Sequence, residues 1–133
     1  MVLAGLAGRM LSTEGMRNLL IVILFSTTLG TILAGPSMTG LASWYGEEHR
    51  GKLMADGHLF DPDKLTAASW LYRLGTRIRV TTPGSTNSVE VTITDRGPAR
   101  GLAQQGRIID LSRAAFERLA NRNLGVINVT VSD

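Results

Sequence analysis

The sequence of 133 residues contains no cysteine. A domain formed by this chain therefore has no disulfide bonds and depends on packing for its stability. The absence of cysteine also excludes the lipid-bearing residue of a bacterial lipoprotein signal. Metal ligands are scarce as well, because the spacing of His49 and His58 relative to nearby acids fits no recognised ligand motif. We therefore expect no metal ion and no cofactor.

A strong net charge is also lacking. Residues 35–133 hold 12 of the 14 Lys and Arg residues and 10 of the 11 Asp and Glu residues, which gives a net charge of +2. This balance does not favour nucleic acid as a partner. Ten of the twelve cations are arginine, the side chain that suits bidentate contacts with carboxylates and stacking on flat faces. The alternative to such a binding role, for any single arginine, is a solvated position on the surface.

No apolar run reaches the roughly 20 residues that a membrane-spanning helix needs. A basic segment, 16–18, precedes a 16-residue apolar segment, 19–34, which is diluted by Ser, Thr and Gly and ends in Ala34. This pattern is typical of an export signal. We expect a signal peptide over 1–34, with Met16 as an alternative start and an uncleaved anchor as the alternative reading. The membrane is then a partner only through this signal.

Residues 35–133 suffice for one modest hydrophobic core. We expect a short linker over 35–39 and a domain over 40–133. Ser112 fits the N-cap of a helix over 113–120, with Leu111 and Phe116 placed as a hydrophobic staple. Segment 65–68 fits a short strand or a helical turn, and clear strand patterns cover 40–46, 77–80, 89–93 and 126–131. Many short strands with one helix predict a small closed β-barrel.

Two carboxylates make the stretch from Ser88 to Ser112 the best candidate for chemistry. Apolar and polar residues alternate over 89–94, which predicts a strand with one buried face. Asp95 continues this alternation on the buried face, so its carboxylate should reach solvent where the strand ends. Asp110 ends the apolar pair 108–109, and we expect two strand-end acids flanking a Gly- and Arg-rich loop. The alternatives are that Asp95 caps the following turn and that Asp110 caps the following helix.

Six motifs follow one another in order at consistent spacing. They are Gly40-Leu-Ala-Ser-Trp-Tyr-Gly46, Ala55-Asp-Gly-x-x-Phe-Asp61, Leu65-Thr-Ala-Ala68, Leu74-Gly-Thr-Arg-Ile-Arg-Val80, Asp95-Arg-Gly-Pro98 and Gly106-Arg-Ile-Ile-Asp-Leu-Ser-Arg-Ala-Ala115. Together they resemble the RlpA-like family of the bacterial envelope, which is related to the first domain of expansins. The resemblance implies a mainly β fold, a six-stranded double-psi β-barrel with one short α-helix. It also implies export to the periplasm or cell envelope.

The resemblance further implies action on peptidoglycan glycan strands. Some members are lytic transglycosylases, which cleave the glycosidic bond by acid/base catalysis without attacking water and leave a 1,6-anhydro sugar. Active members carry a Glu, a His and an Asp at the positions of His58, Ser69 and Asp95. Only Asp95 keeps the family's residue. His58 can act as a proton carrier, or the domain can be a non-catalytic glycan-binding module of expansin-like type.

Asp110 matches an aspartate that expansin-type barrels share. Asp95 and Asp110 can then form an acid pair, in which the less hydrated carboxyl has the raised pKa and serves as the acid. The candidate catalytic residues are Asp95, Asp110, His58 and Ser69, and the candidate substrate-binding residues are Ser43, Trp44, Tyr45, Arg96 and Arg107. A protein-binding module such as an inhibitor is a third reading, supported only by the breadth of the fold. The sequence does not indicate an oligomeric state.

Aromatic residues and arginines are the expected contacts of a glycan. In each of the neighbouring pairs Trp44–Tyr45 and Trp70–Tyr72, one ring should face the core and the other can stack on a sugar. Arginines in or beside the loop between the two acids can meet the lactyl carboxylates of muramic acid. These are Arg96, Arg100 and Arg107.

Overall fold

The computed structural model describes residues 35–133, and the expected signal segment over 1–34 lies outside this range. None of the helices in the described range has the length and apolar character needed to cross a membrane.

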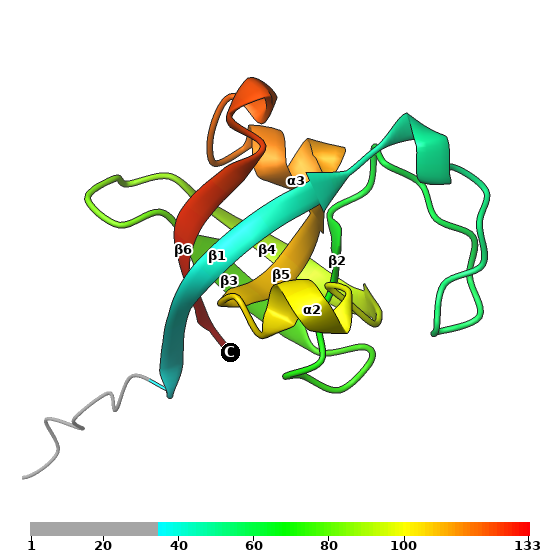
Figure 1. Ribbon diagram of the computed structural model, residues 1–133, viewed down its shortest axis with the longest axis horizontal. Helices are drawn as coiled ribbons and strands as arrows, with labels where there is room; N and C mark the ends of the chain where they lie inside the picture. The colour runs from blue at the N-terminus through cyan, green and yellow to red at the C-terminus, as the bar shows by residue number, and fades with distance from the viewer. Residues whose placement is uncertain (1–34) are drawn as a thin grey trace, which may run out of the picture. The chain divides into compact units, whose positions relative to one another are not determined.

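Six strands close into a barrel in the order β1-β5-β2-β4-β3-β6, as Figure 1 shows. The strands are β1 (Ser37–Tyr45), β2 (Thr66–Ala68), β3 (Arg77–Thr81), β4 (Ser88–Asp95), β5 (Arg107–Ser112) and β6 (Val126–Ser132). The pairs β1–β5 and β2–β4 are parallel, and the other neighbours are antiparallel. The predicted six-stranded barrel is therefore confirmed, and segment 65–68 contributes a strand rather than a helical turn.

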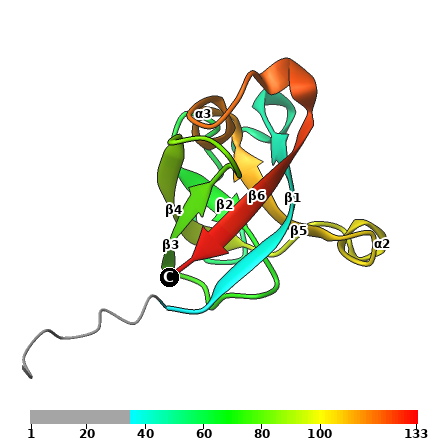
Figure 2. The ribbon, with the colours of Figure 1, turned by 90° about the vertical axis from the view of Figure 1, so that its left-hand side faces the viewer.

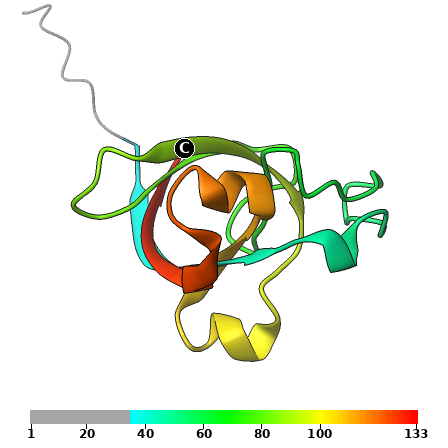
Figure 3. The same cartoon turned by 90° about the horizontal axis from the view of Figure 1, so that it is seen from above.

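The helical elements are few and short. They are η1 (Glu47–His49), α2 (Arg100–Ala103), α3 (Arg113–Glu117) and η2 (Arg122–Leu124). The sequence predicted α3 but not α2, a single turn in the loop between β4 and β5. Figures 2 and 3 show α2 standing away from the barrel wall. The described range thus has a second short α-helix beside the expected one.

Two boundaries differ from the expected ones by three residues. Strand β1 begins at Ser37 rather than Gly40, because Ser37 already pairs with Ser132 of β6, so the strand takes in part of the expected linker. Helix α3 ends at Glu117 rather than at residue 120, and the chain continues in a turn where Leu119 N–H donates to the Phe116 carbonyl at 2.9 Å.

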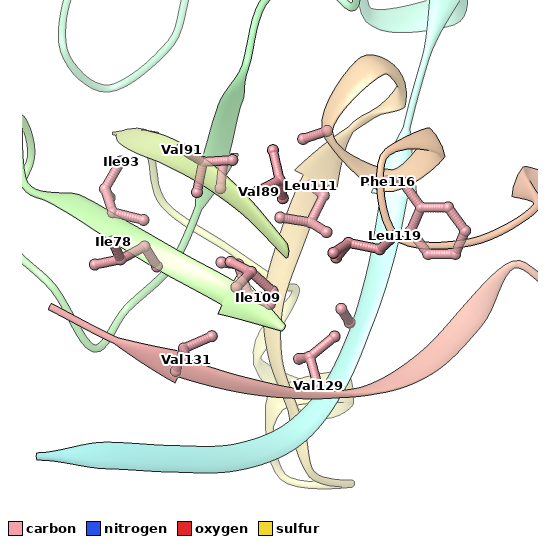
Figure 4. Close-up of a cluster of buried hydrophobic side chains, with 14 residues drawn as sticks. Ile78, Val89, Val91, Ile93, Ile109, Leu111, Phe116, Leu119, Val129 and Val131 are labelled. Carbon is pink, nitrogen blue, oxygen red and sulfur yellow. The ribbon is translucent and has the colours of Figure 1, made fainter. Parts of the chain in front are cut away.

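Alternating apolar side chains of the strands fill the barrel. On β4, Val89, Val91 and Ile93 are buried and alternate with more exposed residues, as the period-two pattern predicted. Figure 4 shows the core, whose largest members include Ile78, Val80, Val91, Ile93, Ile109, Leu111, Phe116, Val129 and Val131. Helix α3 lies over one end of the barrel and carries Phe116 into this core (Figure 3).

The ladder between β2 and β4 contains one irregular step. Ala67 pairs with Ile93, but the next residue, Ala68, pairs with Asp95, so Thr94 is passed over. The register shift is a bulge-type irregularity, the kind of feature that re-aims a side chain. It brings Asp95 level with Ala68 at the end of the short strand β2.

Candidate functional site

Strand register brings the two aspartates to one level of the barrel. Ala68 on β2 pairs with Asp95 on one side and with Asp110 on the other, and Asp110 also pairs with Ser43 of β1. Neighbouring strands lie roughly 5 Å apart, so the Cα atoms of the two acids lie about 10 Å apart across the sheet, with only the small residue Ala68 between them. Their longer side chains can therefore approach one ligand from both sides.

Both carboxylates line one hollow of about 220 Å³, which we call the acid hollow. Its walls are Tyr45, His49, Ala68, Asp95, Arg96 and Asp110. Within residues 35–133, no three His, Asp or Glu side chains gather in a way that would hold a metal ion. The residues that line the hollow carry two carboxyls, a phenol, an imidazole and a guanidinium.

Asp95 emerges at the end of β4, where the sequence placed it. Its Oδ1 accepts hydrogen bonds from the backbone N–H of Ala55 at 3.0 Å and of Arg96 at 2.8 Å. The bond from Arg96 is the expected turn-capping contact, and the bond from Ala55 fixes the carboxylate from the opposite loop. Within the described residues Oδ2 has no hydrogen-bond partner, so one oxygen of Asp95 is oriented and the other is available to a ligand.

Asp110 does not end a strand, contrary to the expectation. Strand β5 continues to Ser112, because Leu111 is buried and the ladder to β1 runs through Ser112. Asp110 does not cap helix α3 either, since the hydroxyl of Ser112 accepts the N–H of Ala115 at 3.3 Å. The Asp110 carboxyl instead points into the acid hollow and accepts a hydrogen bond from the Ser43 hydroxyl.

Burial raises the pKa of Asp110 above its ordinary value. The hydrogen bond from Ser43 and the charges of Arg107 and His49 act in the opposite direction, but the loss of hydration outweighs them. Asp110 therefore keeps its proton to higher pH than an exposed aspartate, as a proton donor needs to do.

Replacing Ser43 with alanine should raise the pKa of Asp110 further. The substitution removes the hydroxyl that stabilises the ionised carboxylate, and burial still acts on it. The shift can be measured by NMR titration of the side-chain carboxyl carbon of Asp110. The matched control is Ser88→Ala, at the exposed first residue of β4, which should leave this titration unchanged. An unchanged titration in Ser43→Ala would contradict the assigned hydrogen bond.

Tyr45 lines the acid hollow and carries a buried hydroxyl. Its ring stacks on Phe60 with centroids 4.3 Å apart, and its oxygen is buried without a hydrogen-bond partner in residues 35–133. Burial raises the pKa of Tyr45, and the charges of Asp95 and Asp110 raise it further. Tyr45 therefore stays protonated, and its hydroxyl is a buried donor that the described residues leave unsatisfied.

The sequence suggested His49 only as a candidate metal ligand and did not place it beside the two acids. Its ring lies edge-on to Tyr45, with centroids 5.5 Å apart, and its Nδ1 lies 3.0 Å from the carboxylate of Glu48. This contact lets Glu48 orient the imidazole that lines the acid hollow. The only signal in the sequence was its place just after the strand that carries Tyr45, because no motif includes it.

An ion-pair network holds the loop that carries His49. Arg50 contacts Asp61 at 3.1 Å and Asp63 at 2.9 Å, and it also pairs with Glu47. Arg113, at the start of α3, pairs with Glu47 at 3.3 Å and with Asp63. Single exposed pairs contribute little, but a network of several charges orders a surface loop more effectively. The network therefore links η1 to the barrel through α3.

The structure places His58 and Ser69 outside the acid hollow. The His58 side chain is 82% exposed, lies 3.2 Å from Asp56 and borders a separate depression. Ser69 is fully buried, and its hydroxyl donates to the Ile108 carbonyl at 3.2 Å and accepts the N–H of Leu71 at 3.1 Å. Of the positions that match the catalytic residues of active family members, only Asp95 therefore lines the hollow.

The predicted substrate-binding residues also divide. Ser43 donates a hydrogen bond to Asp110, and Tyr45 lines the acid hollow. The Trp44 indole instead donates to the Arg122 carbonyl at 3.0 Å and packs on Phe116. Arg96 lines the hollow, but its guanidinium donates hydrogen bonds to the carbonyls of Ser69 and Tyr72, at 2.8 and 2.6 Å. Arg107 acts on the hollow through its charge, which opposes the rise in the pKa of Asp110.

Curated relatives match well over half of this chain. The endolytic peptidoglycan transglycosylase RlpA of Yersinia pestis is 47% identical over 83 residues, which are 62% of this chain and 22% of that protein. The probable enzyme of the same name from Synechocystis is 42% identical over 92 residues, 69% of this chain and 27% of its own length. The chain thus spans about a quarter of the length of these relatives.

Solved structures share the barrel. A Streptomyces papain inhibitor superposes with a TM-score of 0.58 at 27% identity, covering 76% of this chain and 96% of its own. A mutant expansin of Clavibacter michiganensis, in complex with cellohexaose, has a TM-score of 0.55 at 20% identity, covering 72% of this chain and 49% of its own. The expansin likeness shows the shared fold alone.

The sequence model of one family, described as lytic transglycolase, matches residues 37–131. This match covers the closed barrel of mixed strands and both aspartates of the acid hollow. The chain therefore belongs to the lytic transglycolase family of RlpA-like double-psi β-barrel proteins.

Proposed function

We propose that this domain cleaves peptidoglycan glycan strands by the lytic transglycosylase reaction, at the cell envelope. The observation that carries the proposal is the acid hollow, which is lined by both Asp95 and a partly buried Asp110, on either side of Ala68. The names of the curated relatives support the same substrate class. Export through residues 1–34 would bring the domain to that substrate.

Asp110 is the proton donor in this proposal. Because its pKa is raised, it can hold a proton and pass it to the glycosidic oxygen as the bond from C1 of N-acetylmuramic acid breaks. Positive charge then develops at C1 and the ring oxygen, and the Asp95 carboxylate stabilises it from the other side of the hollow. Two backbone N–H groups keep Asp95 in place for this role.

The second half of the reaction returns the proton. The C6 hydroxyl of the muramic acid attacks C1, and its proton passes to Asp110, which is now ionised and acts as the base. A 1,6-anhydro ring forms, the leaving sugar keeps the first proton, and no water is consumed. Tyr45 and the imidazole of His49 border the same space.

The test is incubation of the full chain with peptide-free glycan strands, followed by mass spectrometry of the ends produced. The wild type should release 1,6-anhydromuramic ends, and Asp95→Asn should reduce their release by about 100-fold or more, because an amide carries no charge to stabilise the cation. Asp133→Asn, which changes an aspartate outside the acid hollow, should release these ends at the wild-type rate.

Two outcomes would overturn the proposal. Reducing ends in place of anhydro ends would show hydrolysis by water. Binding of the strands without release by either protein would make the domain a non-catalytic glycan-binding module of the expansin-like type.

A further inference from the structure

An exposed tryptophan is held rigidly beside the acid hollow. The Trp70 residue is 47% exposed, yet its indole Nε1 donates a 2.7 Å hydrogen bond to the carbonyl of Pro98. This bond satisfies the only polar atom of the side chain and fixes the ring between two loops. A flat apolar face is thus presented to solvent in one orientation, which lowers the entropy cost of stacking a ligand on it.

An arginine and an amide complete a pocket around this ring. The guanidinium of Arg100 lies 5.2 Å from the centre of the Trp70 ring, in a cation–π contact. Together with Ala103 and Gln104 they line a depression of about 310 Å³, which we call the Trp70–Arg100 pocket. Arg100 has no carboxylate partner among residues 35–133, so its N–H groups are available to an anionic ligand.

Two short chain segments connect the Trp70–Arg100 pocket with the acid hollow. Ala68 and Arg96 line the acid hollow, and Trp70 and Pro98 each follow two residues later. Two extended residues span at most about 7 Å, so the indole lies within the reach of a sugar chain that occupies the hollow. Helix α2, which carries Arg100 and Ala103, stands out from the barrel (Figure 2).

We infer that the Trp70–Arg100 pocket is a second sugar-binding position of the same groove and selects a sugar that bears a carboxylate. The apolar face of the sugar ring stacks on the indole, and its carboxylate pairs with the guanidinium of Arg100. The Gln104 amide offers a donor and an acceptor to a hydroxyl or acetamido group. The choice of N-acetylmuramic acid, with its lactyl carboxylate, as this sugar rests on the proposed function.

The experiment measures binding of two tetrasaccharides by calorimetry. One comes from peptide-free glycan strands and contains muramic acid, and the other is chitotetraose, which lacks carboxylates. All proteins are the full chain with Asp95→Asn, so that turnover does not obscure binding. Trp70→Ala should weaken both ligands about tenfold. Arg100→Gln should weaken the muramic ligand about tenfold and change chitotetraose binding by less than about twofold.

Matched variants serve as controls, and fluorescence provides a second measurement of binding. Leu124→Ala removes another exposed apolar side chain, and Arg79→Gln another exposed arginine, both outside the Trp70–Arg100 pocket, and neither should change binding. Because the chain has two tryptophans, Trp44→Phe leaves Trp70 as the only indole, whose fluorescence should change on binding. Unchanged melting temperatures would exclude unfolding as the cause of lost affinity.

Each remaining outcome decides against the inference. Wild-type affinity in Trp70→Ala, or no binding of either ligand, overturns the Trp70–Arg100 pocket as a sugar position, and equal weakening of both ligands by Arg100→Gln overturns carboxylate selection. The proposed function fails separately, when wild type releases no anhydro ends. In that case binding that depends on Trp70 and Arg100 would still support the pocket.

Discussion

Asp110→Asn is expected to lower the release of 1,6-anhydromuramic ends by about 100-fold or more. The amide has nearly the shape of the carboxyl, and its oxygen can still accept the hydrogen bond from Ser43. It cannot donate an acidic proton, so both halves of the reaction lose their proton carrier. The measurement is the rate of formation of anhydro ends by mass spectrometry, with Asp133→Asn as the control.

The same substitution should make the protein more stable at neutral pH. Burial raises the pKa of Asp110 in the folded state above its ordinary value of 3.8, so the folded protein binds this proton more tightly than the unfolded chain. The resulting stabilisation is complete below that value and is lost as pH rises through the raised pKa. Asp110→Asn should remove this decline in the free energy of unfolding.

Chemical denaturation at several pH values can separate catalysis from stability. Wild type and Asp110→Asn should differ most above the raised pKa and least in acid. An Asp110→Asn protein that keeps most of its activity would assign the proton to another group in the acid hollow. A variant that is less stable than wild type at neutral pH would contradict the physical account of the raised pKa.

Phe116→Ala is expected to reduce the free energy of unfolding by about 3–5 kcal/mol. Phe116 is fully buried, belongs to the central core and reaches it from helix α3 over the end of the barrel. Its removal leaves a cavity that the closed barrel cannot collapse, because the strands are fixed by their ladders. The loss can be measured by urea denaturation monitored by circular dichroism.

An exposed residue provides the comparison for Phe116. Leu124 is 63% exposed in η2, and Leu124→Ala should change the free energy of unfolding by no more than about 0.5 kcal/mol. Equal effects of the two substitutions would show that Phe116 is not a core residue. Because Trp44 packs on Phe116, its fluorescence should also shift in Phe116→Ala.

Local patterns were sufficient to predict most of the strands. Alternation placed β3, β4 and β6 within a few residues of their bounds, and the Ser112 cap located the start of α3. These features depend on neighbouring residues in the chain. Helix α2 was not predicted because a single turn in a loop of small and polar residues has no periodicity to detect.

The candidate site was predictable only in part. Asp95 and Asp110 stood out as carboxylates beside buried runs, and the structure brings both to the acid hollow. His49 did not stand out, because its place depends on the fold of the loop and on the orientation given by Glu48. The association of Trp70 with Arg100 is equally non-local, since 30 positions separate them and the hydrogen bond to Pro98 sets the indole.

Because of the irregular step between β2 and β4, the alignment of Asp95 with Asp110 depends on how the two backbones pair. With regular pairing after Ala67 and Ile93, the threonine at position 94 would stand opposite Ala68. Asp95 would then no longer lie level with Asp110, although no residue had changed. An insertion or deletion in this stretch of β4 would consequently be more damaging than a substitution of a residue there other than Asp95, and a functional relative must preserve the spacing of the chain as well as its acidic groups.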